Sequence, residues 1–209
     1  MSIDGMTSES LDVLREIGNI GAGNAVTALA SLLGREVDMS VPVAQVVDFN
    51  EITNIMNGPE TFIAGVLVDM TGDLTGYILL VLEITNAYEL VSMVLGDERP
   101  APEDISADAF GEMELSALTE IANILIGSYL SSLCTLTNLN IQPSVPAIAM
   151  DMLGAIMSIV AIQYGQIGDS VLLLSTKFTE MDKEIAGNFF LIPDYDSYEK
   201  LMNSLGIGT

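Results

Sequence analysis

Residues 12–42 read DVLREIGNIGAGNAVTALASLLGREVDMSVP, and residues 116–146 read SALTEIANILIGSYLSSLCTLTNLNIQPSVP. Aligned without gaps, the two stretches share apolar positions, one glutamate, one asparagine, one glycine and a final Ser-Val-Pro. The matching pairs are Leu14/Leu118, Glu16/Glu120, Ile17/Ile121, Asn19/Asn123, Ile20/Ile124, Gly23/Gly127, Leu29/Leu133 and Leu32/Leu136. The chain therefore contains an internal repeat, whose first element is a long helix followed by a strand.

The tails of the two halves also match, because Gly76–Glu83 resembles Gly187–Asp194. After each of these stretches an Asn or Asp precedes a Glu by three residues, so we expect helix N-caps at Asn86 and Asp196. The offset between the copies grows from 104 residues at the first glutamates to 110 at these caps. The second half therefore carries a small insertion.

Each half is predicted to form a long helix, a strand through Ser-Val-Pro, a short helix, two strands and a closing helix. The Gly-Asp-Leu-Thr-Gly stretch at 72–76 is a hairpin signal, so neighbouring strands should be antiparallel. The long helices are expected at 8–34 and 107–136, and the strands at 37–47, 62–71, 75–83, 140–148, 169–179 and 187–193.

This arrangement predicts an α+β fold of two layers. Internally duplicated helix–strand units would surround a mainly antiparallel six-stranded sheet with pseudo-twofold symmetry. Half of the residues are hydrophobic (50%), which is ample for a core. Neither half covers enough apolar surface alone, so repeats 1–96 and 105–206 should share one core in a single domain of residues 1–209.

The chain is strongly acidic, with 29 Asp and Glu against 6 Lys and Arg and a formal net charge of −23. Nucleic acids and anionic membranes are bound through clusters of Lys and Arg, so neither is an expected partner. Residues 121–150 carry no charge, but polar side chains interrupt them and prolines end them, which indicates a buried helix and strand. The first ten residues include no basic one, so no secretory signal is predicted, and we expect a cytoplasmic, monomeric protein.

The chain has no histidine and a single cysteine, Cys134. The lack of histidine excludes Ser-His-Asp and Cys-His catalysis and His-ligated zinc. Cys134 lies in an apolar run and is expected to be a buried small side chain. Any catalysis must therefore use carboxylates, amides, hydroxyls or chemistry that the substrate brings.

Three polar side chains share one face of each long predicted helix. Asp12, Glu16 and Asn19 are spaced i, i+4 and i+7, so they fall within an arc of about 60°. The same spacing recurs in the second copy at Ser116, Glu120 and Asn123. Their apolar neighbours lie towards other faces and can pack on the sheet, so both triplets should face outward.

A single Glu-x-x-Asn on a helix is most simply a solvated face. Its recurrence favours a function, because Asn is a mediocre helix former with no propensity reason to appear twice. An amide can hold a water by accepting one hydrogen bond and donating another, and a carboxylate can pair with a lysine on a partner. These roles suit a protein that assists a partner carrying both a metal ion and a reactive phosphoryl group. Transfer of that phosphoryl group to water mainly needs the water to be held in line for attack.

Gly18, Gly21 and Gly23 lie inside the first predicted helix. Their order, and the lack of a following Lys-Ser or Lys-Thr, disfavour a nucleotide-binding loop. Each glycine in a helix costs about 1 kcal/mol relative to Ala, so a reason for their presence is expected. Close approach of the backbone, to the sheet or to a docked partner, is the simplest reason.

The full pattern is Asp/Ser-x3-Glu-x2-Asn-x22-Pro, present twice and ending at Pro42 and Pro146. It resembles the signature of the CheC/CheX/FliY family of CheY-P phosphatases. The likeness covers nearly the whole chain and includes Gly18–Asn24 and Phe190–Asp194. The resemblance implies hydrolysis of the aspartyl phosphate on the chemotaxis response regulator CheY. It also implies no metal or cofactor of the chain's own, because the bound regulator supplies the Mg²⁺.

The resemblance implies a role for each motif residue. The asparagines would orient the attacking water, and the glutamates would bind the active-site lysine of the regulator. The first motif positions would tune docking, and the prolines would be structural. The implied catalytic residues are Glu16, Asn19, Glu120 and Asn123, with docking by Asp12 and Ser116 and structural roles for Pro42 and Pro146.

The family also binds CheD, a receptor deamidase, through a short helix in the second half. Residues 149–164 are apolar with three methionines, and Asp151 is the only charged residue between Glu120 and Asp169. A buried core helix and an exposed partner surface are both open interpretations; if exposed, this segment is the expected CheD surface, with Asp151 at its edge. The alternative to a phosphatase is a non-catalytic, CheY-P-sensing adaptor that sequesters CheD, and a structural role in the flagellar switch is a third.

Overall fold

The computed structural model describes residues 8–34, 36, 38–40, 43–96, 106–163, 170–180 and 183–205. The helices are α1 (Ser8–Leu33), α2 (Ile52–Ile55), α3 (Ile84–Leu95), α4 (Glu112–Thr137), α5 (Leu153–Gln163) and α6 (Tyr195–Ser204). The strands are β1 (Asp38–Met39), β2 (Val43–Asp48), β3 (Phe62–Gly72), β4 (Gly76–Glu83), β5 (Ile141–Pro143), β6 (Ala147–Met152), β7 (Ser170–Glu180) and β8 (Lys183–Pro193).

All neighbouring strands of the sheet are antiparallel. The order is symmetric about the central β4–β8 pair, with β3 and β7 on either side and an interrupted strand at each edge. The edge strand β2 of the first half pairs with β7 of the second, and β6 of the second half pairs with β3 of the first. The halves therefore exchange edge strands, and the predicted α+β fold with pseudo-twofold symmetry is confirmed. The boundaries of the repeats stay a prediction.

The described sheet has eight strands, not the predicted six, because each edge position holds two short strands, β1 and β2 on one side and β5 and β6 on the other. Pro146 lies between β5 and β6, and proline has no N–H to donate to a strand ladder, so the pairing is interrupted there. Serine closes the gap in the same way at both edges. Ser40 N donates to Lys177 O at 2.9 Å, and Ser40 Oγ accepts from Lys177 N at 3.1 Å. Ser144 makes the same pair of bonds with Asp69, at 2.9 and 3.0 Å.

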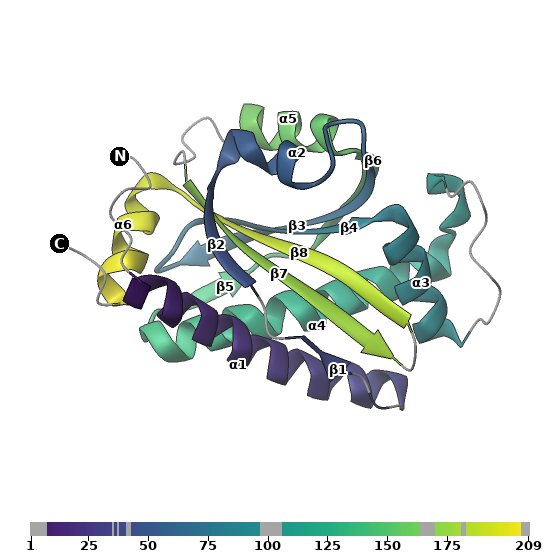
Figure 1. Ribbon diagram of the computed structural model, residues 1–209, viewed down its shortest axis with the longest axis horizontal. Coiled ribbons are helices and arrows are strands. Elements are labelled where there is room, and N and C mark those ends of the chain that lie inside the picture. The colour runs from purple at the N-terminus through teal and green to yellow at the C-terminus, as the bar shows by residue number, and fades with distance from the viewer. Residues whose placement is uncertain are drawn as a thin grey trace.

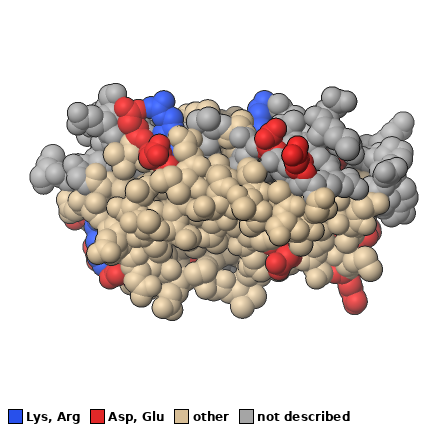
Figure 2. Space-filling view, turned by 90° about the horizontal axis from the view of Figure 1, so that it is seen from below, with Lys and Arg blue, Asp and Glu red and all other residues tan. Residues whose placement is uncertain are grey.

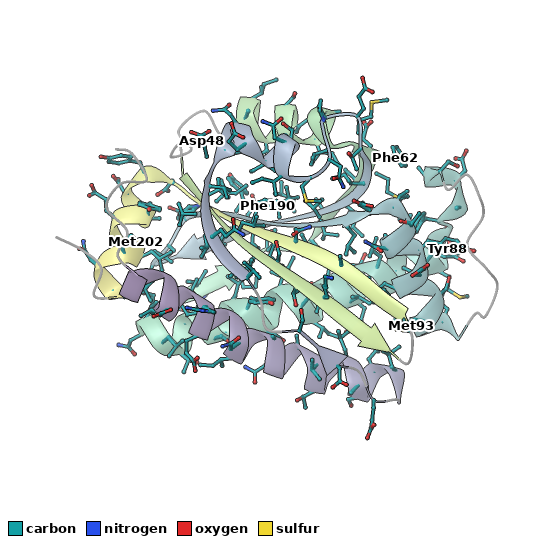
Figure 3. The ribbon with its side chains drawn as sticks, viewed as in Figure 1. Asp48, Phe62, Tyr88, Met93, Phe190 and Met202 are labelled. Carbon is teal, nitrogen blue, oxygen red and sulfur yellow. The ribbon has the colours of Figure 1, made fainter. Side chains whose placement is uncertain are left out.

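Two apolar clusters cover the two faces of the sheet, because side chains alternate along each strand. On β4, Leu80 and Leu82 belong to the cluster between the sheet and the helices α1 and α4. Leu79 and Val81 belong to a second cluster, between the other face of the sheet and the helices α2 and α5. Phe190 of β8 belongs to the second cluster and lies near the middle of the sheet (Figure 3). The strand β4 is buried on both of its faces, which explains its uninterrupted apolar run. The short helices α2 and α5 thus add a thin third layer to the predicted two (Figure 1).

The long helices α1 and α4 lie side by side under one face of the sheet and run in opposite directions (Figure 1). By length and composition alone α4 could cross a membrane, and it is the one helix of the described residues of which this is true. In the folded chain, 56% of its most apolar window is buried inside the protein, which is typical of a core helix. Cys134, predicted to be buried, is half-buried on α4.

The predicted N-caps of the closing helices are wrong by three residues for α3 and by two residues for α6. The helix α3 begins at Ile84 after Glu83, and α6 begins at Tyr195 after Asp194. Asn86 lies within α3 and donates from Nδ2 to Ala186 O at 3.2 Å. Both helices begin directly where a strand ends, so the tight strand-to-helix turn overrides the local Asn/Asp-x-x-Glu pattern.

Candidate functional site

The motif residues lie in the first half of α1 and of α4. Five of the six side chains are exposed, and Asn19 is half-buried. Ile17, Leu118 and Ile121, their apolar neighbours, are buried in the core cluster between the helices and the sheet. This packing fixes the rotation of both helices, so the triplets face away from the sheet. The six residues are Asp12, Glu16 and Asn19 on α1 and Ser116, Glu120 and Asn123 on α4.

The two triplets lie towards opposite ends of the helix pair, because α1 and α4 are antiparallel and each triplet is in the first half of its helix (Figure 1). Figure 2 looks onto this side of the molecule. Uncharged side chains form a broad central surface there, and the charged ones stand mostly towards its margins. The structure therefore presents two separate candidate sites on a largely uncharged helical face.

The glutamates of both triplets are available to a partner. Glu16 and Glu120 are exposed, and neither forms an ion pair with any residue that the structure describes. An exposed carboxylate without a cationic neighbour can accept a charge-assisted hydrogen bond from an incoming ammonium group. This is the chemistry that binding to a lysine requires.

The two asparagines differ in their surroundings. Asn123 is exposed, so its amide meets solvent directly. Asn19 is half-buried, and its Oδ1 atom is buried without a hydrogen-bond partner among the described residues. A buried carbonyl oxygen without a partner is costly, and turning outward to accept a hydrogen from water would satisfy it.

The first motif positions differ as well. Asp12 forms an exposed ion pair with Arg15, one turn along α1. The opposite charges three residues apart were a sequence signal for this pair that the motif analysis did not use. In the second copy these positions hold Ser116 and Thr119, and Thr119 Oγ1 donates to Leu115 O at 2.7 Å. The second triplet therefore has no competing cation on its own helix.

The packing of α1 against α4 explains one of the helix glycines. A Cβ added at Gly21 would lie 2.7 Å from Tyr129 Cδ1 and 3.2 Å from Tyr129 Cα. Burial raises the pKa of the Tyr129 hydroxyl, which stays neutral. A second contact joins the same two helices, because Asn24 Nδ2 on α1 donates to Ser132 Oγ on α4 at 3.4 Å. The close approach predicted from the glycines is thus made to the neighbouring helix.

Of the two motif prolines, Pro146 is half-buried between β5 and β6, two residues after Ser144. Pro42 lies outside the described residues. Asp151 is exposed on β6, where its carboxylate accepts a hydrogen bond from the backbone N of Met152 at 2.7 Å.

The apolar segment around α5 is divided between core and surface. Its first four residues, 149–152, belong to β6 rather than to a helix. Ile159 and Ile162 on the outer face are 53% and 82% exposed. Both open interpretations therefore apply, each to one face of the helix. The inner face consists of Leu153, Ile156, Met157 and Val160, which are buried in the second cluster.

Comparisons with known proteins agree with this geometry. The CheC-like family model matches residues 9–45 and 113–150, which contain both triplets. The chain is 38% identical over 209 residues to the CheY-P phosphatase CheC of Bacillus subtilis (strain 168), covering 99% of each protein.

Two further similar proteins are both named FliY. The flagellar motor switch phosphatase FliY of Bacillus subtilis (strain 168) is 30% identical over 148 residues, which is 71% of this chain and 37% of that protein. The crystal structure of Thermotoga maritima FliY has the same fold, with a TM-score of 0.75 at 22% identity over 98% of this chain and 99% of that one. The identity of 38% to the Bacillus subtilis protein over nearly the full length of both chains shows that this chain belongs to the CheC-like family.

Proposed function

We propose that this chain hydrolyses the aspartyl phosphate of the chemotaxis response regulator CheY. The observation that carries the proposal is the pair of outward-facing Glu/Asn sets on α1 and α4 in a chain 38% identical to a CheY-P phosphatase. These side chains suit a partner that already holds a reactive acyl phosphate, because the remaining need is a positioned water.

The asparagine amide of each site orients the water. Its carbonyl oxygen accepts a hydrogen from the water, and its NH₂ group can donate to a phosphoryl oxygen. The water oxygen then bonds to phosphorus as the bond between phosphorus and the aspartyl oxygen breaks. The regulator recovers its carboxylate, and the second product is inorganic phosphate. The exposure of Asn123 and the unpartnered Oδ1 of Asn19 support this role.

Each glutamate anchors the regulator. Glu16 and Glu120 pair with the lysine at the regulator's active site, which the absence of described ion pairs at either carboxylate supports. Asp12 and Ser116 tune docking, and Pro42 and Pro146 hold the edge strands. The Mg²⁺ that balances the phosphoryl charge comes with the regulator, so the chain works without a metal or cofactor of its own.

A second part of the proposal is regulation by CheD in the cytoplasm, with this chain acting as a monomer. The outer face of α5 is the proposed contact, with Asp151 beside it. Its support is the exposure of Ile159 and Ile162 on a helix whose other face is fully packed. The non-catalytic adaptor that sequesters CheD remains the alternative, and the same surface would serve it.

The decay of CheY-P in the presence of catalytic amounts of this chain tests the proposal. The parent protein should accelerate phosphate release over many turnovers, and the double variant Asn19→Ala/Asn123→Ala should return decay to the unassisted rate. Asn203→Ala, an exposed asparagine on α6 outside both motifs, is the matched control and should leave decay accelerated. A stable stoichiometric complex in which CheY-P persists would favour the adaptor instead.

A further inference from the structure

Two helix glycines have no structural reason within the described chain. A Cβ added at Gly23 or at Gly127 would meet nothing within 4 Å. Gly21 is the contrast, because a Cβ there would collide with Tyr129. Glycine is the poorest helix former apart from proline, so a mid-helix glycine in open space weakens its helix without a packing gain.

The two glycines occupy the same position of the repeat. Each lies four residues after the motif asparagine, at 19 and 23 on α1 and at 123 and 127 on α4. Four residues advance a helix by about 6 Å and about 40°, so each glycine lies one turn beyond its asparagine on the same outward side. Gly23 is exposed and Gly127 is half-exposed. Glycine therefore recurs beside both candidate sites, where the surface is open.

We propose that Gly23 and Gly127 are docking positions, at which the phosphorylated regulator comes into contact with the helix backbone. This inference rests on the proposed function and names the part of the helix that sets the depth of docking. The asparagine amide must reach a water held against an acyl phosphate, and its side chain is short. A side chain one turn away on the same side would hold the two surfaces apart. A misplacement of about 1 Å can lower a rate by up to about 10²-fold.

The inference predicts opposite effects on stability and on activity. Gly23→Ala and Gly127→Ala should each raise the melting temperature, by about 2–4 °C, because alanine favours the helix and has free space. The same variants should lower kcat/KM for CheY-P by about threefold at the altered site. The larger changes Gly23→Leu and Gly127→Leu should lower it by about tenfold or more. A variant that is more stable yet less active cannot owe its loss to unfolding.

Each site is measured with the other silenced. Gly23 variants are made together with Asn123→Ala, and Gly127 variants together with Asn19→Ala, so that one site reports at a time. Affinity for CheY loaded with beryllofluoride, a stable stand-in for the phosphoryl group, should fall in parallel with kcat/KM. Gly21→Ala is the structural control and should lower the melting temperature through its contact with Tyr129.

The possible outcomes separate this inference from the proposed function. A parent protein that neither binds nor dephosphorylates CheY overturns the proposed function, and the docking role with it. An active parent whose Gly→Ala and Gly→Leu variants keep kcat/KM and affinity unchanged overturns the docking role alone. A lowered melting temperature in Gly23→Ala or Gly127→Ala also overturns it, because an internal packing role would then explain the glycine.

Discussion

The two motif helices carry Glu and Asn at the same spacing, but they present them in different surroundings. On α4, Asn123 is exposed and no cation of the same helix competes for the first motif position. On α1, Asn19 has a buried oxygen without a described partner, and Asp12 is paired with Arg15. The spacing of a motif thus sets which side chains share a face of a helix. The surrounding residues decide whether the polar atoms of those side chains are exposed and unpaired.

The contact between the helices shows where the symmetry of the two halves breaks. The position of Gly21 on α1 corresponds to Leu125 on α4, and that of Tyr129 on α4 corresponds to Ala25 on α1. In both pairs of corresponding positions, the small residue is on α1 and the large one is on α4. The large Tyr129 meets the backbone of α1 two residues after Asn19. The two sites are therefore expected to differ in activity although their motifs agree.

The largest expected effect is the unequal loss of activity when one asparagine is removed. Asn123→Ala should lower the total CheY-P hydrolysis rate by about fivefold, whereas Asn19→Ala should lower it by less than about twofold. The reason is that the oxygen of Asn19 is buried in the resting structure, so the outward-turned side chain is the less populated one, by on the order of 1 kcal/mol after its hydrogen bond to water is counted. The measurement is phosphate release at saturating CheY-P for each single variant.

Equal losses from the two single variants would contradict this ranking and would mean that the buried oxygen of Asn19 carries no cost. A larger loss from Asn19→Ala would reverse it. Melting curves of both variants provide the control, because neither side chain makes a described hydrogen bond that holds the fold. Their melting temperatures should remain close to that of the parent.

The closing helices offer a second comparison between the halves. Asp194 caps α6, accepting from Ser197 N at 2.8 Å and from Thr75 Oγ1. Glu83 stands at the same position before α3 and makes no capping bond. Asp194→Ala should therefore lower the free energy of unfolding by about 1 kcal/mol, and Glu83→Ala by less than about 0.5 kcal/mol. Denaturant unfolding at neutral pH measures both.

The same cap should depend on pH. Burial opposes ionisation of Asp194, but hydrogen bonds from Thr75 and Ser197 outweigh it and hold the pKa below its usual value. A depressed folded-state pKa stabilises the fold above the unfolded-state pKa of about 3.9, and this stability is lost as the pH falls through the folded-state value. The difference between the parent and Asp194→Asn should thus be largest near neutral pH and shrink towards acid. A difference that grows in acid would contradict the cap.

The elements that the sequence predicted well are those with long apolar periodicity. The first long helix was expected at 8–34 and spans Ser8–Leu33, and the hairpin at 72–76 joins β3 to β4 as expected. The start of α5 was placed too early, because an apolar run without a turn residue does not distinguish a strand from a buried helix. The breaks in the edge strands also went unpredicted, although Pro146, at the break between β5 and β6, is a residue that interrupts strand pairing.

The sequence predicted which way the side chains of the candidate site face, but not whether their polar atoms are exposed to solvent. Residues four and seven apart must share a face of a helix, so the exposure of Glu120 and Asn123 follows from spacing together with apolar neighbours. The close approach of α1 to α4 at Gly21 and Tyr129, two residues after Asn19, is a contact between residues about a hundred positions apart. Spacing within one helix contains no information about that approach.

The smallest expected effect concerns the ion pair on α1. Arg15→Ala should change the free energy of unfolding by less than about 0.5 kcal/mol, because exposed pairs one turn apart contribute little. If Asp12 tunes docking through its charge, removing Arg15 leaves that charge unpaired and should alter CheY-P hydrolysis at the first site. This hydrolysis is measured in the Asn123→Ala background, in which the second site is silent. The effect should shrink as salt is added, because exposed charges are screened. Thr119→Ala, at the matching position of α4 and measured together with Asn19→Ala, is the neutral control. An equal response to both changes would mean that the charge of Asp12 does not distinguish the two sites.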